Sequence, residues 1–278
     1  MYDAEISRSN PTAYIFLIDQ SGSMQEPMVS GSYKSQFVAD VINRTLRDLV
    51  VRCTREEGVR DYFHVGVIGY GDTSVRNALG GALGQNWLNP ISAIADNTRR
   101  IEERPRKIDD GAGGITTQNV RFPVWVDPVN SGGTPMVAAL AHCADIVATW
   151  SDDFPDSFPA TVLHITDGAA TDGDPEPVAD FLQSQVRTSN GSTLMYNIHV
   201  SSTAATAIRY PADEDDLPDE YAQMLFRMSS TFPEHIRRYA SDAYGLSIDR
   251  DSRAMVLNAD AEELVKFLDI GSRPAAMR

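Results

Sequence analysis

Cysteine and lysine are scarce in these 278 residues. The cysteines are Cys53 and Cys143 alone, and lysine stands only at Lys34, Lys107 and Lys266. Two cysteines cannot form a disulfide framework, so we expect a reducing, cytoplasmic setting. Basic residues number 24 against 39 acidic ones, which gives a formal net charge of −15. Because this charge repels phosphate and anionic lipid, we expect neither nucleic acid nor a membrane surface as a partner.

Long apolar runs and common catalytic motifs are also missing. The apolar run at 13–18 is far shorter than the roughly 20 residues of a membrane-spanning helix. Residues 1–5 contain neither a basic nor an apolar segment, so we expect no secretory signal. The sequence has no Gly-x-Ser-x-Gly elbow, no phosphate-binding Gly-x-x-x-x-Gly-Lys-Ser/Thr loop and no His-Glu-x-x-His zinc helix. These absences argue against the enzyme classes that use those motifs.

Short β-rich apolar segments alternate with amphipathic segments of helical periodicity. We expect strands at 12–18, 62–70, 160–166, 194–200 and 255–257. We expect helices at 35–53, 136–150, 175–188, 219–228 and 259–268, the last capped by Asn258 or Asp260. Strands that alternate with helices predict an α/β fold, doubly wound, with a mostly parallel central sheet flanked by helices. We interpret 1–278 as one domain.

Residues 72–133 show few periodic signals, and we interpret them as an insertion within that domain. A short helix is expected at 91–96, and two extended arms, 99–108 and 115–126, flank the glycine-rich segment 109–114. This pattern is typical of a β-hairpin. One hypothesis is that the hairpin turn stands near the functional edge of the sheet and shapes what docks there. The alternative is a stabilising flap far from that edge.

Other conspicuous side chains have a structural explanation. Trp87 and Trp125 could anchor a partner, but packing of the insertion is the simpler role for such large apolar groups. His164 and His199 lie in apolar strands, where we expect hydrogen-bonded core residues. Residues 171–174 contain two aspartates without the ligand order of a calcium loop, and we expect a turn there.

Polar loops stand at the ends of three predicted elements. Asp19-Gln20-Ser21-Gly22-Ser23 follows the first strand, Asp167-Gly168 follows strand 160–166, and Ser131-Gly132-Gly133-Thr134 precedes the helix at 136–150. Parallel strands present their carboxyl ends at one edge of the sheet, so these loops can meet. Two carboxylates and three hydroxyls suit a hard cation such as Mg²⁺ or Mn²⁺. Glycines at 22, 132 and 133 allow close backbone approach.

These motifs, in this order, resemble the metal-ion-dependent adhesion site of the von Willebrand factor type A (vWA) family. The resemblance rests on Asp19-x-Ser21-x-Ser23, on Thr134 in Gly-Gly-Thr-Pro and on Thr166-Asp167-Gly168, and it covers roughly 11–268. The chain is most similar to intracellular bacterial vWA domains, such as those encoded beside tellurium-resistance genes. Asp19 and Thr134 stand 115 positions apart, which departs from the simple family pattern because of the insertion.

The resemblance implies a Rossmann-like fold and a function in metal-dependent protein–protein interaction. It implies Mg²⁺ or Mn²⁺ as the ion, with Ca²⁺ less favoured, and an acidic side chain of a partner protein completing the coordination shell. The implied metal ligands are Asp19, Ser21, Ser23, Thr134 and Asp167.

A Mg²⁺-dependent phosphatase-like hydrolase with Asp19 as nucleophile is the alternative, because it would use the same ion and the same sheet edge. Such an enzyme would need a carboxylate two residues after the nucleophile as acid and base. Ser21 stands there instead. The enzyme would also need a lysine near the phosphate, and none of the three has an evident place there. We therefore expect a binding module that is not an enzyme.

Overall fold

The structure is a computed structural model that describes residues 2, 4–29, 31–109, 115–202, 205–215 and 217–272. Its central sheet has five parallel strands: β14 (Met255–Ala259), β12 (Leu194–Val200), β9 (Thr161–Thr166), β1 (Thr12–Asp19) and β4 (Phe63–Gly71), in that order. Three short strands pair antiparallel at its margins: β13 (Ile208–Arg209), β5 (Ser74–Asn77) and β6 (Asn89–Pro90). The predicted α/β fold with a mostly parallel central sheet is confirmed.

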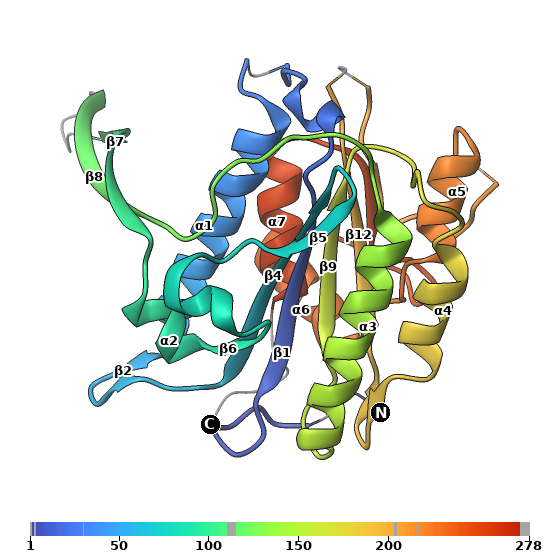
Figure 1. Cartoon of the computed structure of the whole chain (residues 1–278), viewed down its shortest axis with the longest axis horizontal. Coiled ribbons are helices and arrows are strands. Elements are labelled where there is room, and N and C mark those ends of the chain that lie inside the picture. The colour runs from blue at the N-terminus through green and yellow to red at the C-terminus, as the bar shows by residue number, and fades with distance from the viewer. Residues whose placement is uncertain are drawn as a thin grey trace.

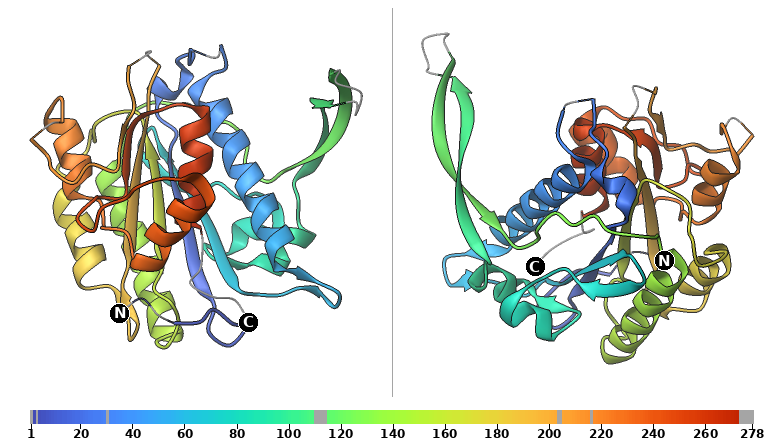
Figure 2. Two further views of the ribbon diagram at one scale, coloured as in Figure 1. Left: turned by 180° about the vertical axis from the view of Figure 1, so that it is seen from behind. Right: turned by 45° about the horizontal axis from the view of Figure 1, so that its top comes forward.

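Helices cover both faces of this sheet (Figures 1 and 2). One face carries α1 (Lys34–Cys53), α6 (Glu234–Tyr244) and α7 (Ala261–Gly271). The other carries α3 (Met136–Asp153) and α4 (Glu176–Ser184), with α5 (Glu220–Arg227) beside β14. The central strand β1 is buried on both sides, because Phe16 packs into the α1 layer and Leu17 into the α3 layer. Because the strand is buried on both sides, its sequence is a nearly continuous apolar run.

Residues 72–133 contain β5, β6, the 3-10 helix η2 (Gly81–Gln85), α2 (Ile91–Asp96) and the strands β7 (Arg100–Asp109) and β8 (Ile115–Val124). The strands β7 and β8 pair antiparallel and form an arm that stands clear of the sheet on the α1 side (Figures 1 and 2). The turn at 110–114 lies outside the described residues, so the hypothesis that it shapes docking stays a prediction.

The base of this arm is packed into the core. Trp125 is buried, and its indole N–H donates to the Ile94 carbonyl at 2.8 Å. The Asn43 side chain of α1 accepts from the backbone N–H groups of Trp125 and Val126, at 2.8 and 3.0 Å. Trp125 is therefore a structural residue, whereas Trp87 is only half buried.

Some boundaries differ from the prediction. The helix expected over 175–188 ends at Ser184, and Arg187–Thr188 (β10) pairs with Gly191–Ser192 (β11) instead. The sequence pattern also did not predict α6 or the small hairpin of β2 (Thr54–Arg55) and β3 (Gly58–Val59). Asp260, not Asn258, caps α7, since its Oδ1 accepts from the backbone N–H groups of Glu262 and Glu263. Among the described helices, none combines the length and the apolar character that crossing a bilayer requires.

Candidate metal-binding site

Asp19 is the last residue of β1 and is only 2% exposed. Its Oδ1 accepts from the Ser21 backbone N–H at 2.8 Å, and its Oδ2 accepts from the hydroxyl of Thr166, which ends the neighbouring strand β9, at 2.9 Å. Burial raises the pKa of the Asp19 carboxyl, and the negative charge of Asp167 raises it further. A cation bound between the two carboxylates would relieve both effects.

Three further oxygen atoms follow in a row from Ser21. The Ser21 and Ser23 hydroxyl oxygens lie 3.0 Å apart, and the Ser23 hydroxyl donates to Asp167 Oδ1 at 2.7 Å. Adjacent ligands of an octahedral Mg²⁺ ion with bonds of 2.0–2.1 Å are separated by about 2.9 Å. The spacing of these oxygens therefore fits the ion that the donor set suits.

The loop that carries Thr134 is fastened to the Asp19 loop through the backbone. The Gly22 N–H donates to the Gly132 carbonyl at 2.9 Å, and the Ser131 N–H donates to the Gln20 carbonyl at 2.7 Å. Gly132 has φ +62°, and a Cβ there would lie 2.5 Å from the Asp72 Cα, so only glycine fits this crossing.

The structure thus brings all five predicted residues to one edge of the sheet, though not all into contact. Hydrogen bonds link Asp19, Ser21, Ser23 and Asp167 in a chain. Thr134 stands two residues after Gly132, whose carbonyl accepts from the Gly22 N–H, and is 7% exposed. Within the described residues, no hydrogen bond joins its hydroxyl to the other four.

Lys34, the first residue of α1, is a site residue that the sequence analysis missed. Its Nζ donates to Asp167 Oδ2 at 2.9 Å and to Glu26 Oε2 at 2.8 Å, and the lysine side chain is 4% exposed. Burial alone lowers the pKa of Lys34, but the bonds to Glu26 and Asp167 raise it overall. The ammonium is therefore charged at neutral pH and supplies a fixed cation next to Asp167.

Thr171 and Asp172 also position the Thr134 loop. They belong to the segment 171–174, which was expected to be an ordinary turn. The Thr171 hydroxyl accepts from the Thr134 N–H at 2.9 Å. The Asp172 carboxylate accepts from the N–H groups of Val137 and Ala138, at 3.1 and 2.9 Å. Asp172 thus caps the N-terminus of α3 from a distant part of the chain.

His164 is a fully buried residue behind the site. One ring nitrogen lies 2.7 Å from the Tyr70 hydroxyl and the other lies 2.8 Å from Asn197 Oδ1. Burial lowers the pKa of His164 to about 4. His164 is therefore the hydrogen-bonded core histidine that the apolar sequence of its strand predicted. It is not one of the candidate metal ligands.

No cluster of three or more His, Cys, Asp or Glu side chains suited to a metal ion occurs in the part of the chain that the structure describes. The candidate site is of another kind, because it combines two carboxylates with three hydroxyls. The two carboxylates balance the charge of a divalent ion, and the three hydroxyls add none, so the set does not burden the ion with excess negative charge that would repel a further ligand.

No family model and no curated protein matches the sequence. Solved structures with partial likeness include the manganese-loaded TRAP protein of Plasmodium vivax, 14% identical, with a TM-score of 0.40 over 81% of this chain and 65% of that one. The vWF domain of the type V pili tip protein Mfa5 from Porphyromonas gingivalis is also 14% identical, with a TM-score of 0.32 over 58% of this chain and 39% of that one. For the pilus adhesin SpaC of Lactobacillus rhamnosus GG the identity is 14%, with a TM-score of 0.46 over 94% of this chain and 31% of that one.

The chain spans less than two thirds of the length of each of these three proteins. Likeness at this level does not assign a function.

Proposed function

We propose that this chain is a metal-dependent protein-binding module of the vWA kind, and not an enzyme. Asp19, Ser21, Ser23, Thr134 and Asp167 would hold Mg²⁺ or Mn²⁺. The ion would supply a positive centre to which an acidic side chain of a partner protein binds. The observation behind this proposal is the row of oxygens from Ser21 through Ser23 to Asp167, at 3.0 and 2.7 Å.

Exposure of the residues indicates from which side a partner would approach. Asp19 and Ser21 are buried, whereas Ser23 is exposed. The site therefore opens to solvent at Ser23, while its inner carboxylate is fixed by two hydrogen bonds. A fixed inner ligand and an open outer side are what replacement of a bound water by a partner carboxylate needs.

The surface charge restricts how an acidic partner is attracted. With a net charge of −15, the chain repels acidic proteins beyond the range of direct contact. Attraction must come from the site itself. We therefore expect binding to depend strictly on the metal and not to weaken when salt screens the long-range repulsion.

Localisation in a bacterial cytoplasm, as for the tellurium-resistance type of vWA protein, belongs to the same proposal. The two cysteines, Cys53 and Cys143, are buried free thiols, as a reducing compartment allows.

Mn²⁺ binding followed by electron paramagnetic resonance tests the metal site directly, because only free Mn²⁺ gives the sharp solution signal. We expect one Mn²⁺ per chain, displaced by Mg²⁺. Ser23→Ala and Thr134→Ala should weaken binding by about tenfold or more, as the loss of a fixed ligand implies. Ser184→Ala, at an exposed position on α4, is the matched control and should bind as wild type does. Equal Mn²⁺ binding by all variants would refute the proposed ligand set.

The phosphatase-like alternative is tested by a separate activity measurement. Lys34 lies where such an enzyme could use it, but both Asp19 oxygens accept hydrogen bonds and Ser21 occupies the acid–base position. We expect no hydrolysis of p-nitrophenyl phosphate with Mg²⁺. Turnover that is lost in Asp19→Asn would establish the enzyme instead.

A further inference from the structure

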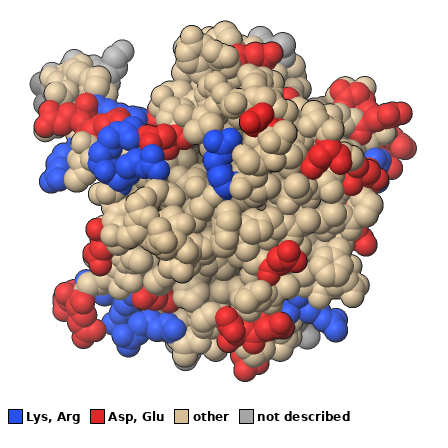
Figure 3. Space-filling view, viewed as in Figure 1, with Lys and Arg blue, Asp and Glu red and all other residues tan. Residues whose placement is uncertain are grey.

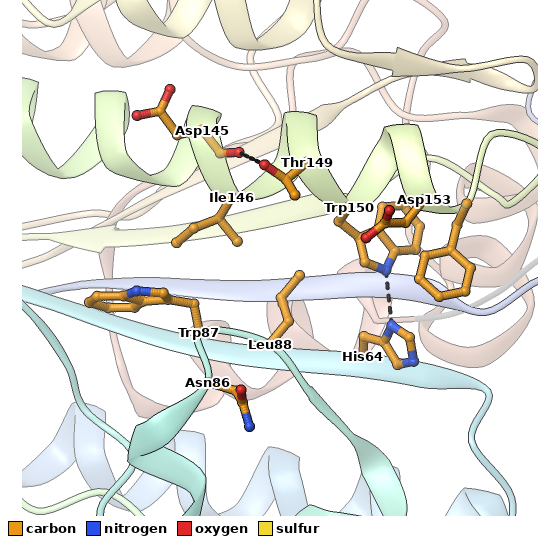
Figure 4. Close-up of a pocket in the computed structure, with 10 residues that line it drawn as sticks. His64, Asn86, Trp87, Leu88, Asp145, Ile146, Thr149, Trp150 and Asp153 are labelled. Carbon is orange, nitrogen blue, oxygen red and sulfur yellow. Dashed lines mark hydrogen bonds between the residues drawn. The ribbon is translucent and has the colours of Figure 1, made fainter.

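A groove lies between the C-terminal half of α3 and residues 86–88, which precede β6 (Figure 4). Its volume is about 520 Å³, within the range of ligand-binding clefts. The first residue of α3 that lines it is Asp145, about 14 Å along the helix axis from Met136. The groove is therefore separate from the candidate metal site at the start of α3.

Aromatic rings form one end of the groove. Trp150 is buried, and its indole N–H donates to His64 Nδ1 at 3.0 Å (Figure 4). Phe154 stacks on Trp150 with 5.4 Å between ring centroids and meets the His64 ring edge-on at 5.0 Å. These contacts fix the rings, so this end of the groove is formed before any ligand arrives.

The other end is formed by Trp87. Its ring packs against His142 at 4.2 Å between centroids. Ile146 and Leu88 lie between the two aromatic ends, one on each wall (Figure 4). The side chains of Trp87, Leu88 and Ile146 are all only half buried. The floor therefore offers apolar surface and two partly open aromatic rings, Trp87 and Phe154.

The charge along the groove has one sign. Asp145 and Asp153 line it and are exposed, no lysine or arginine lines it, and neither aspartate forms an ion pair within the described residues. Asp153 is also the last residue of α3, whose final turn has no basic residue. The C-terminal end of a helix is already partially negative. A carboxylate there is unfavourable on its own, and a bound cation would compensate it.

His64, which lines the groove, does not offset this negative charge. His64 accepts a hydrogen bond at Nδ1, which a protonated ring could not do. Burial lowers the pKa of His64 as well.

The face that contains α3 also has few charged side chains near its middle, as Figure 3 shows.

We infer that this groove binds an extended basic segment of a partner protein, in which two arginine or lysine side chains four residues apart flank an apolar one. Asp145 and Asp153 are eight residues apart on α3, which separates them by about 12 Å along the axis. In an extended chain, residues i and i+4 point to the same side and lie about 13 Å apart. The two spacings match, and residue i+2 would contact Ile146 and Leu88.

The aromatic ends add to this preference, since arginine binds well over exposed indole and phenyl rings. The net charge of −15 attracts a basic segment at long range. This inference goes beyond the proposed metal-dependent function and does not depend on it, because no candidate metal ligand lines the groove.

The test uses fluorescence anisotropy of a labelled nine-residue peptide with two arginines four residues apart around one leucine, measured with EDTA present. A second peptide has citrulline in place of both arginines. We expect the arginine peptide to bind and the citrulline peptide not to. Asp145→Asn and Asp153→Asn should each weaken binding up to about fivefold, and together by more. Asp152→Asn removes a neighbouring exposed charge outside the groove and should leave binding unchanged.

Other outcomes would overturn the inference. Equal binding of the arginine and citrulline peptides would show that binding does not depend on the peptide's charge. A loss of affinity in Asp152→Asn as large as that in Asp145→Asn or Asp153→Asn would show that the two groove carboxylates have no special role. Displacement of the peptide by equimolar spermidine would identify a small-polyamine site rather than a peptide site. Absence of binding at millimolar peptide would exclude the groove as a docking site, while the Mn²⁺ experiment would still decide the proposed function independently.

Discussion

The Lys34 ammonium lies 2.9 Å from Asp167 Oδ2, inside the candidate metal site. Both side chains are almost completely buried, at 4% and 0% exposure. Asp167 therefore has two possible cations, the lysine already present and the metal that the neighbouring oxygens suit. The lysine balances the charge of Asp167, and a divalent ion would have to bind beside the ammonium group.

Substituting Lys34→Met removes that charge and keeps the length of the side chain. We expect Mn²⁺ affinity to rise by about tenfold or more, because a fixed positive charge near the ion is gone. Without metal the variant should be destabilised by about 3 kcal/mol, since Asp167 loses its buried partner. Electron paramagnetic resonance and urea unfolding with and without Mn²⁺ measure the two effects.

Lys266→Met is the matched control, because Lys266 pairs with Glu262 on the surface of α7. It should change neither quantity measurably. Weaker Mn²⁺ binding in Lys34→Met would show that the lysine orients Asp167 for the metal rather than competing with it.

Gly132→Ala tests the crossing of the two loops. Its φ of +62° disfavours alanine, and the new Cβ would also lie 2.5 Å from the Asp72 Cα. Gly81→Ala has nearly the same φ, +63°, but no atom within 4 Å of the new Cβ. We expect Gly81→Ala to cost about 1 kcal/mol in unfolding free energy and Gly132→Ala at least about 2 kcal/mol more, together with weaker Mn²⁺ binding. Equal losses in the two variants would mean that the loop shifts freely.

The acid stability of the chain should depend on His164. Its pKa is about 4 in the folded chain against 6.5 for the free side chain. Between these values the unfolded chain binds the extra proton, so the unfolding free energy falls as the pH decreases from 6.5 to 4. This residue alone contributes up to about 3 kcal/mol to that fall. Urea unfolding in EDTA, compared with His164→Asn, measures the contribution.

Nuclear magnetic resonance of the histidine rings gives a second readout that does not require the variant to fold. The His164 ring should stay neutral at pH 5.5. A ring that titrates near pH 6.5 would contradict the expected linkage.

The elements that periodicity predicted best are the buried ones. Strand β1 and helix α1 lie within one or two residues of their predicted ranges, because a two-sided core and an amphipathic face each leave a clear pattern. Helix α6 was missed although it has one apolar face. Its sequence Glu234–Tyr244 contains mostly polar residues. The helix is stabilised by the packing of Ile236 and Ala240 into the core.

Contacts between distant segments could not be predicted in the same way. Asp19, Ser21, Ser23, Thr134 and Asp167 could be proposed as one site because short motifs mark the ends of elements. Lys34 has no such motif, and it reaches Asp167 only because α1 begins beside β9 in space. Asp172 likewise caps a helix that begins 36 residues earlier in the chain.

Arg104 ties the β7–β8 arm to α1, and its removal should loosen that attachment. Its guanidinium contacts Asp40 of α1 at 2.8 Å and Glu102 at 2.7 Å, and it lies 3.9 Å from the centre of the Phe122 ring. Arg104→Met keeps the aliphatic stem and removes the charge. We expect a loss of about 1–2 kcal/mol in unfolding free energy, from two partly exposed ion pairs and one cation–π contact.

The control for this variant is Arg238→Met, whose only ion pair within the described residues is with the exposed Glu234 and should cost less than about 0.5 kcal/mol. Urea unfolding compares the two, and hydrogen exchange locates the effect. Because the base at Trp125 stays bonded to Asn43 of α1, faster exchange should concentrate in β7 and β8. If Arg104→Met were as harmless as Arg238→Met, the ion pair between Arg104 and Asp40 would not contribute to the attachment of the arm.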